Sequence, residues 1–299
     1  MKRYLSHALI AMVMGVGGLA FAQQDGRQSD ADRDKKLEAN DALAFQALAT
    51  EPQCFTSGSP AGSPNDPFGR TFFKVCITER GNISELESPA GKTQIVSARE
   101  GYAVCSGINA DTVHGFDAGI AEDGWGIPTV TQSNGPGTLP LVIRRDSLDG
   151  KVRLTQTFTI NTGAREIQVA MAVKNLTAST LSLLVARYFD GDIEGTSSDD
   201  RYDLTRDSVW GTPKSTNSVA TGLMLTQNAS SIGGSLSIVE KFSDWTPSGS
   251  SFQNARKCNA IGHQAVPTLA GDFVGRLVVD PGPMNPGQTR TVTYRYRRF

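Results

Sequence analysis

The chain has 299 residues, of which 38% are hydrophobic, with 31 glycines and 14 prolines. This composition is typical of a globular protein with many turns. Its 29 Lys and Arg nearly balance its 30 Asp and Glu, so the charge gives no reason to expect a nucleic acid or an anionic membrane as partner.

The chain begins like a secretory signal peptide, which we assign to residues 1–22. Two basic residues, Lys2 and Arg3, precede an apolar run that ends at Leu19, and Ala20-Phe21-Ala22 supplies small residues where signal peptidase reads the chain. The apolar run is too short for a transmembrane helix. We therefore expect a secreted or periplasmic protein with no transmembrane segment after signal cleavage.

Residues 23–69 are expected to form a polar leader in front of the folded domain. Apolar residues at helical spacing predict one short helix from about Asp32 to Ala49. The segment Ser57–Gly69 (SGSPAGSPNDPFG) follows it. Its glycines, prolines and serines indicate a linker or a long loop.

All four cysteines lie in the mature chain: Cys54, Cys76, Cys105 and Cys258. An even number in an exported protein indicates two disulfides, with three possible pairings. A zinc site is disfavoured because no two cysteines have the spacing of zinc ligands. Any pair that includes Cys258 closes a loop of well over a hundred residues, which chain entropy makes worth roughly 4–5 kcal/mol.

Residues 70–299 are predicted to be all-β, in one large antiparallel β-sandwich. In Lys151–Ile160 and Glu166–Lys174, apolar and polar residues alternate, which is typical of strands with one buried face. Tight turns at Asp149-Gly150 and Asn161-Thr162-Gly163, and a third turn at Asn175–Ser179, join neighbouring strands. We therefore predict four consecutive antiparallel strands, Thr138–Arg145, Lys151–Ile160, Glu166–Lys174 and Leu181–Phe189.

The last of these segments, Leu181–Phe189, is apolar on both faces. Such a strand is expected to be covered on both sides, near the middle of a layered structure. Two packed antiparallel sheets are the natural solution. Further strands are predicted at Thr71–Thr78, Lys92–Ser97, Tyr102–Cys105, Gly222–Thr226, Ser235–Glu240, Phe273–Val279 and Thr289–Arg297.

An acidic segment follows the doubly covered strand and contains Asp190, Asp192, Glu194, Asp199 and Asp200. Alternating carboxylates before a glycine resemble the start of a calcium loop. Position twelve of that loop, however, is Arg201 instead of Glu. A structural Ca²⁺ is thus one hypothesis, and a solvated loop paired with Arg187, Arg201 or Arg206 is the favoured alternative.

The glycine-rich segment from Asp111 to Trp125 collects candidate catalytic residues, His114, Asp117 and Glu122. A histidine beside carboxylates can act as an acid or a base, and an exposed tryptophan can form a platform for a sugar. Trp125, Trp210 and Trp245 are the candidate platforms. The simpler interpretation is that the histidine belongs to an ordinary loop and that the tryptophans fill the core.

The stretch Ile167–Glu194 resembles part of the galactose-mutarotase-like super-sandwich, in which a strand ending in Val-x-Asn precedes a polar turn, an apolar strand and an aromatic-Asp end. It also resembles secreted bacterial β-sandwich proteins of uncharacterised function. The resemblance implies a large sandwich with a saccharide-facing surface. No catalytic residue is carried over, because neither His114 nor His263 aligns with the catalytic positions.

Three hypotheses for function follow. The leading one is a non-enzymatic exported module that binds a glycan or an envelope component through the loops around Trp125 and Asp190–Asp203. The second is a carbohydrate-active enzyme that uses loop carboxylates, with or without His114. The third is a structural or partner-binding envelope protein whose acidic loop holds calcium.

Overall fold

The computed structural model describes residues 51–96, 100–106, 112–119, 121–195, 200–213, 222–227, 234–241, 258 and 269–299. The predicted signal peptide and the predicted leader helix lie outside these residues. One compact unit extends over Ala49–Phe299, so the expected domain start at residue 70 lies inside it. In the residues described, no helix has the length and apolar character needed to cross a bilayer.

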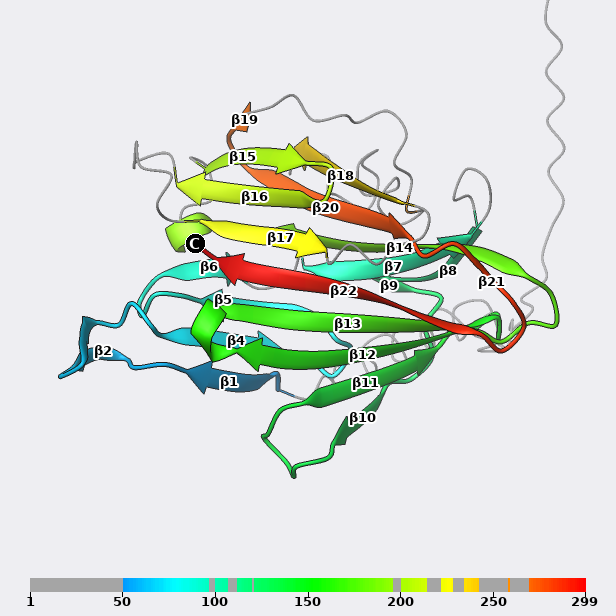
Figure 1. The fold of residues 1–299 in the computed structure, drawn as a ribbon, viewed down its shortest axis with the longest axis horizontal. Coiled ribbons are helices and arrows are strands. Elements are labelled where there is room, and N and C mark those ends of the chain that lie inside the picture. The colour runs from blue at the N-terminus through cyan, green and yellow to red at the C-terminus, as the bar shows by residue number, and fades with distance from the viewer. Residues whose placement is uncertain are drawn as a thin grey trace, which may run out of the picture. The chain divides into compact units, whose positions relative to one another are not determined.

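The described residues form one large sheet, two smaller sheets that face it and a separate two-stranded sheet (Figure 1). The nine-stranded sheet has the order β10 (Thr129–Gln132), β11 (Leu141–Asp146), β12 (Val152–Asn161), β13 (Glu166–Asn175), β22 (Thr289–Arg298), β17 (Leu223–Gln227), β16 (Ser208–Pro213), β15 (Asp200–Thr205) and β19 (Leu269–Ala270).

The facing layer contains a seven-stranded sheet and a four-stranded sheet. The seven-stranded sheet has the order β18 (Gly234–Lys241), β20 (Phe273–Asp280), β14 (Leu181–Asp190), β7 (Gly101–Ser106), β8 (Thr112–Asp117) and β9 (Glu122–Asp123), and β21 (Pro283–Met284) pairs with β14. The four-stranded sheet has the order β1 (Gln53–Ser57), β4 (Phe73–Ile77), β5 (Ile83–Glu87) and β6 (Thr93–Val96).

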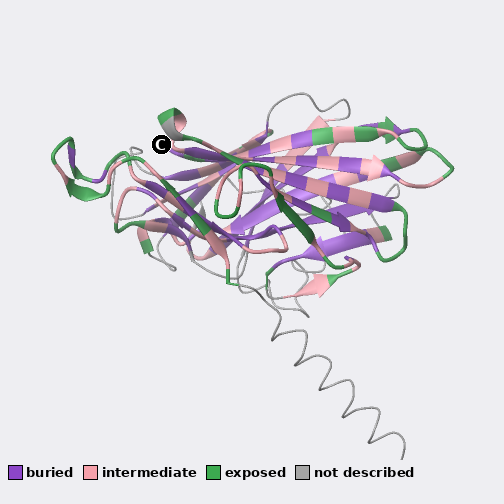
Figure 2. Cartoon of the chain, turned by 90° about the horizontal axis from the view of Figure 1, so that it is seen from below, coloured by how far each residue is buried: buried purple, intermediate pink, exposed green. Residues whose placement is uncertain are grey.

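The predicted alternation of buried and exposed residues is confirmed in the large sheet. Every second residue from Val152 to Phe158 of β12 and from Val169 to Val173 of β13 is fully buried, while the residues that alternate with them are half-buried. Figure 2 shows the result as stripes of buried and half-buried positions along the strands. The inner face of the nine-stranded sheet packs on the facing sheets in one continuous apolar cluster, so the all-β sandwich is confirmed.

One predicted pairing is wrong. The segments expected as four consecutive strands form β11, β12 and β13 side by side, but β14 lies in the other sheet, between β20 and β7. The place beside β13 is taken by β22. The physical reason is the character of the faces: β22 alternates polar and apolar residues, as a half-exposed sheet requires, whereas β14 is apolar on both faces.

The prediction that β14 is covered on both sides is confirmed. Val185 and Phe189 belong to the main apolar cluster between the sheets. Ala186 and Tyr188, on the opposite face, belong to a second cluster that also contains Cys258. The second cluster covers the outer face of the seven-stranded sheet around this strand.

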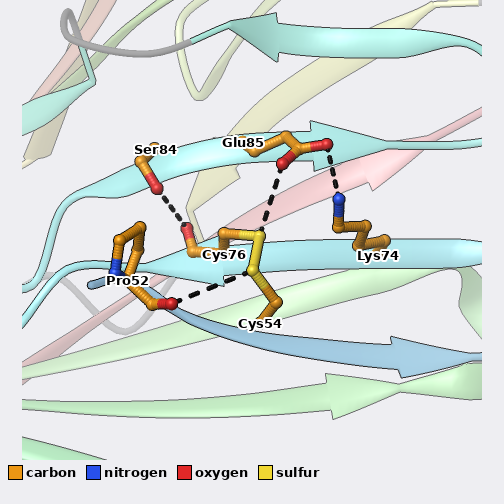
Figure 3. The surroundings of a disulfide bond; sticks show 6 residues. All are labelled: Pro52, Cys54, Lys74, Cys76, Ser84 and Glu85. Atoms are coloured by element: carbon orange, nitrogen blue, oxygen red, sulfur yellow. Dashed lines mark hydrogen bonds and ion pairs between the residues drawn. A yellow bond between two sulfur atoms is a disulfide. The ribbon is translucent and has the colours of Figure 1, made fainter.

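Two disulfides are present, as predicted. Cys54–Cys76 joins β1 to β4 at directly opposite positions, beside an ion pair of 2.8 Å between Lys74 Nζ and Glu85 Oε1 (Figure 3). Cys105–Cys258 joins β7 to a residue 153 positions later. Of the three pairings that the sequence left open, the structure thus contains the one in which the first two cysteines pair with each other.

The segment predicted as a linker or loop contains a small hairpin. Ala61–Ser63 (β2) pairs with Asp66–Phe68 (β3). The carboxylate of Asp66 accepts hydrogen bonds from Thr71 and from the backbone of Arg70, and the bonds from Thr71 are the main reason that its pKa is lowered. Two short 3-10 turns, Thr162–Ala164 and Ile193–Gly195, complete the described elements.

Candidate functional site

His114 has two side-chain partners and is completely enclosed. Its Nδ1 lies 2.7 Å from Asp149 Oδ2, and its Nε2 lies 2.8 Å from Ser106 Oγ. Ser106 ends β7, His114 lies on the adjacent β8, and Asp149 lies in the turn between β11 and β12. The contacts follow the same order as in a Ser-His-Asp hydrolase.

The accessibility of the three side chains, however, is the reverse of that in a hydrolase. There the aspartate is buried and the serine meets the substrate. Here the side chain of Asp149 is 31% exposed and that of His114 is 0% exposed, while Ser106 is 7% exposed. The carboxylate also accepts a hydrogen bond of 2.6 Å from Ser147 Oγ. This arrangement is that of a polar link between the nine-stranded and seven-stranded sheets.

The candidate carboxylates Asp117 and Glu122 do not contact His114. Both bind Arg145: its Nη1 lies 2.9 Å from Asp117 Oδ2, and its Nη2 contacts Glu122 Oε1. Arg80 Nη1 lies 2.9 Å from the second oxygen of Glu122. Burial raises the pKa of Asp117, and the charge of Arg145 opposes that rise. The structure thus brings the two carboxylates together, but around guanidinium groups that neutralise them.

Trp125 is a core residue. It is 5% exposed, its ring lies 5.9 Å from that of Tyr102, and Arg145 Cζ lies 5.8 Å from its ring. A Cβ placed on Gly115 would lie 2.2 Å from the indole, so the neighbouring strand needs a glycine there to let the ring approach. The indole is therefore covered by the protein's own side chains and does not present a platform to a ligand.

Trp210 has a different environment. It lies on β16 between the buried residues Val209 and Gly211, and it is half-buried. Residues alternate across a strand, so its side chain lies on the outer face of the nine-stranded sheet. Its cross-strand neighbours are Met224 on β17 and Asp203 on β15. Trp245, the third candidate, lies outside the described residues.

In the acidic segment, Glu194 is held by Lys92 and Arg298. Glu194 Oε2 lies 3.4 Å from Lys92 Nζ, and Glu194 Oε1 lies 3.9 Å from Arg298 Nη2. Asp200 is buried, and its Oδ2 accepts a hydrogen bond of 2.9 Å from Ile193 N. Asp190 and Asp192 are half-buried. Asp199 lies outside the described residues.

Calcium at this segment stays a prediction. Among the residues that the structure describes, no three His, Cys, Asp or Glu side chains are grouped closely enough to hold a metal ion. The carboxylate of Glu194 is already engaged by two cations. The other acidic residues could contribute oxygen ligands of the kind that Ca²⁺ prefers.

Arg187, one of the cations expected beside the acidic segment, instead points into the core. Its Nε lies 2.7 Å from Glu100 Oε1, and both side chains are completely buried. Arg187 Nη1 also donates a hydrogen bond of 2.8 Å to Gln156, and Ile83 N donates one of 2.6 Å to Glu100 Oε2. Burial raises the pKa of Glu100 to about 7, against the opposing charge of Arg187.

Comparison with protein families and with curated proteins found no match. Among solved structures, the chain is similar to a bacterial glucoamylase complexed with acarbose, with a TM-score of 0.53 and 11% identity over 84% of this chain and 33% of that one. The chain thus spans about a third of the length of the glucoamylase. This likeness establishes the fold alone.

Two other kinds of structure were found. A heparan sulfate lyase from Pedobacter heparinus gives a TM-score of 0.44 at 11% identity, over 90% of this chain and 41% of that one. A putative aldose 1-epimerase from Escherichia coli K12 gives 0.35 at 10% identity, over 82% and 99% of the two chains. Aldose epimerases were the group that the sequence resemblance implied, and their low scores add no argument about this chain's function.

Sequence reasoning missed the partners of the buried polar groups. Ser106 carried no signal beyond being the end of a strand, and Asp149 was noted only as a turn residue. Glu100 was not singled out at all. The one available signal was Arg187, a charged residue inside an otherwise apolar strand, because a charge at such a place requires a buried partner.

Proposed function

We propose that this chain is an exported carbohydrate-binding module whose ligand lies on the outer face of the nine-stranded sheet, with Trp210 as its stacking platform. The observation that carries the proposal is the position of Trp210 on this outer face. Of the three tryptophans considered from the sequence, Trp125 is enclosed and Trp245 is not described. Trp210 is thus the candidate that a ligand can reach.

The surroundings of Trp210 suit a sugar. An indole offers an apolar face to the ring of a sugar and an N–H to one of its oxygens. Asp203 and Met224 flank it across the neighbouring strands, and Arg297 follows Met224 in the same row. Carboxylate and guanidinium groups beside an aromatic platform supply the hydrogen bonds that orient a polar ligand.

Export is supported by the two disulfides, because such bonds form and persist in oxidising compartments. It also agrees with the signal peptide predicted for residues 1–22. The glucoamylase that shares the fold is complexed with acarbose in its structure. We extend that observation to this chain only as support for a ligand of the same chemical class.

The first prediction concerns Trp210. A glycan array with the mature protein should identify a bound glycan, and Trp210→Ala should weaken that binding at least about thirtyfold, since removing an aromatic anchor costs about 2 kcal/mol or more. Isothermal titration with the glycan measures the loss. Phe68→Ala is the matched control, because Phe68 is an exposed aromatic (67%) on β3, a strand of a separate two-stranded sheet.

Two results would contradict the proposal. One is a folded mature protein that binds no glycan on the array. The other is a bound glycan whose affinity falls equally in the Trp210 and Phe68 variants. The hypothesis of a carbohydrate-active enzyme stays a prediction, and the ion pairs that engage Asp117 and Glu122 give it no additional support.

A further inference from the structure

The outer face of the nine-stranded sheet has a low central strip of short side chains. Strand register places residues of β12, β13 and β22 in two adjacent rows, and every member is Thr or Ala. We call this set the threonine strip: Thr155, Ala172 and Thr291 in one row, and Thr157, Ala170 and Thr293 in the next. All six are half-buried or exposed, so a ligand can approach the sheet closely there.

Long cationic side chains stand on both sides of this strip. Lys174 on β13 lies beyond one row, and Arg297 on β22 lies beyond the other, while Arg144 on β11 continues the row of Thr155. Arg144 and Arg297 are exposed and Lys174 is half-buried. None of the three forms an ion pair with any residue in the described part of the chain.

The acidic groups near the strip are already engaged. Asp146 Oδ1 lies 2.6 Å from Arg153 Nε, and Glu166 Oε1 lies 3.7 Å from Arg295 Nε. In the described part of the chain, the three cations thus have no ion-pair partner, although Arg144 lies near enough to Asp146 to help lower the pKa of that carboxyl; the whole chain has a formal net charge of −1. A positive face on a protein that is slightly negative overall favours an anionic ligand at that face.

The spacing of the cations indicates a polymer. Arg297 lies opposite Glu166 of β13, and Lys174 lies farther along β13, roughly 27 Å away at about 3.4 Å per residue. Trp210 lies two strands from Arg297, roughly 10 Å away at about 4.8 Å per strand. A single sugar cannot span these separations, whereas an extended chain can contact the indole, the threonine hydroxyls and the cations together.

We propose that the ligand of this face is an acidic polysaccharide, with carboxylate or sulfate groups at intervals along its chain. This inference rests on the proposed function and specifies the ligand class of the same site. The threonine hydroxyls bond to sugar hydroxyls on the strip. Arg144, Lys174 and Arg297 pair with the anionic groups at its margins.

The experiment compares three ligands of similar length: a polyuronate, a neutral polysaccharide and polyglutamate. Affinity gel electrophoresis of the full mature chain at low and at physiological ionic strength measures each affinity. The test variant is Arg144→Gln/Lys174→Gln/Arg297→Gln. The control variant is Arg70→Gln/Lys92→Gln/Arg206→Gln, which removes the same charge at positions away from the strip.

We expect polyuronate to bind more tightly than the other two ligands, and its affinity to fall as salt is added. The test variant should bind it about tenfold more weakly and lose most of the salt dependence, and the control variant should match the wild type.

If the neutral polysaccharide binds as tightly as polyuronate, and Trp210→Ala still weakens binding, the inference of an acidic ligand is wrong and the proposed function stands. Equal affinity for polyglutamate would overturn that inference as well, since the face would then recognise charge alone. Binding to none of the glycans on the array or in the gel would overturn the proposed function itself.

Discussion

A carboxylate and a guanidinium lie in the centre of the sandwich, where isolated charges are costly. Glu100 and Arg187 are each completely buried, and desolvating two ions offsets much of their attraction. The pair is tolerated because its polar atoms have partners: Tyr296 OH and Ile83 N bond to the carboxylate, and Gln156 and the carbonyl of Gly81 accept from the guanidinium. These bonds join β5, β12, β14, β22 and the residue that precedes β7 across both layers.

The raised pKa of Glu100 predicts a pH dependence of stability. Its pKa is about 7 in the folded protein against an ordinary value of 4.5, so the folded protein binds this proton more tightly than the unfolded chain does. Its stabilising contribution is therefore complete below about pH 4.5 and is lost as the pH rises through about 7. Urea unfolding of the wild type and of Glu100→Gln, from about pH 4 to about pH 8, measures it.

The informative quantity is the difference in unfolding free energy between the two proteins. Other carboxyl groups, such as Asp66 and Asp146 with their lowered pKa values, stabilise the folded protein more as the pH rises. Their contribution is the same in the wild type and in the variant, so it cancels in the difference. The wild type should lose stability relative to the variant between about pH 4.5 and 7. A difference in unfolding free energy that does not vary with pH would contradict the raised pKa of Glu100.

At the scale of elements, the two disulfides constrain the unfolded chain unequally. Cys105–Cys258 closes a loop with a separation of 153 residues, and Cys54–Cys76 closes one of 22. Chain entropy makes these links worth about 5 and about 3 kcal/mol. Cys105→Ser/Cys258→Ser should therefore destabilise the protein more than Cys54→Ser/Cys76→Ser. Thermal unfolding of both double variants checks the order, and the opposite order would be contrary to this expectation.

The acidic segment after β14 allows a direct test of calcium. If Asp190 and Asp192 hold Ca²⁺, adding the ion should raise the unfolding temperature, because a ligand that binds only the native state stabilises it. Asp190→Asn/Asp192→Asn should remove the increase. Mg²⁺ is the control, since it prefers a smaller octahedral site. An unfolding temperature that responds to neither Ca²⁺ nor a chelator would eliminate the hypothesis.

Individual strands could be predicted from the sequence more readily than their neighbours. Lys151–Ile160 was expected as a strand and forms β12 (Val152–Asn161), because alternation reports directly on which face is buried. The partner of β13 was mispredicted, because a short turn at Asn175–Ser179 suggested a hairpin to Leu181–Phe189. Alternation in β22 is equally regular, but no local signal shows that this distant strand fits beside β13.

At the scale of the whole molecule, the sequence predicts which types of residue form the candidate site, but not which of these residues lie together. Trp210 is one of the three tryptophans proposed as platforms from the sequence, but no pattern in the sequence distinguishes it from Trp125. The ring of Trp125 is enclosed by Tyr102 and Arg145 and packs closely on Gly115. The cations around the threonine strip come from β11, β13 and β22, so their proximity depends on strand order across the entire sheet. Local spacing contains no information about such long-range neighbours.

The place of β22 has a consequence for how this protein folds. This strand is far from β13 in the sequence, yet it lies in the interior of the nine-stranded sheet, bonded to β13 on one side and to β17 on the other. Until β22 has paired with both strands, β13 and β17 each leave an edge without a partner. Pairing between distant segments is slow, and unpaired edges invite aggregation. The two edges that β22 joins are therefore the part of the large sheet most open to wrong pairing before folding is complete.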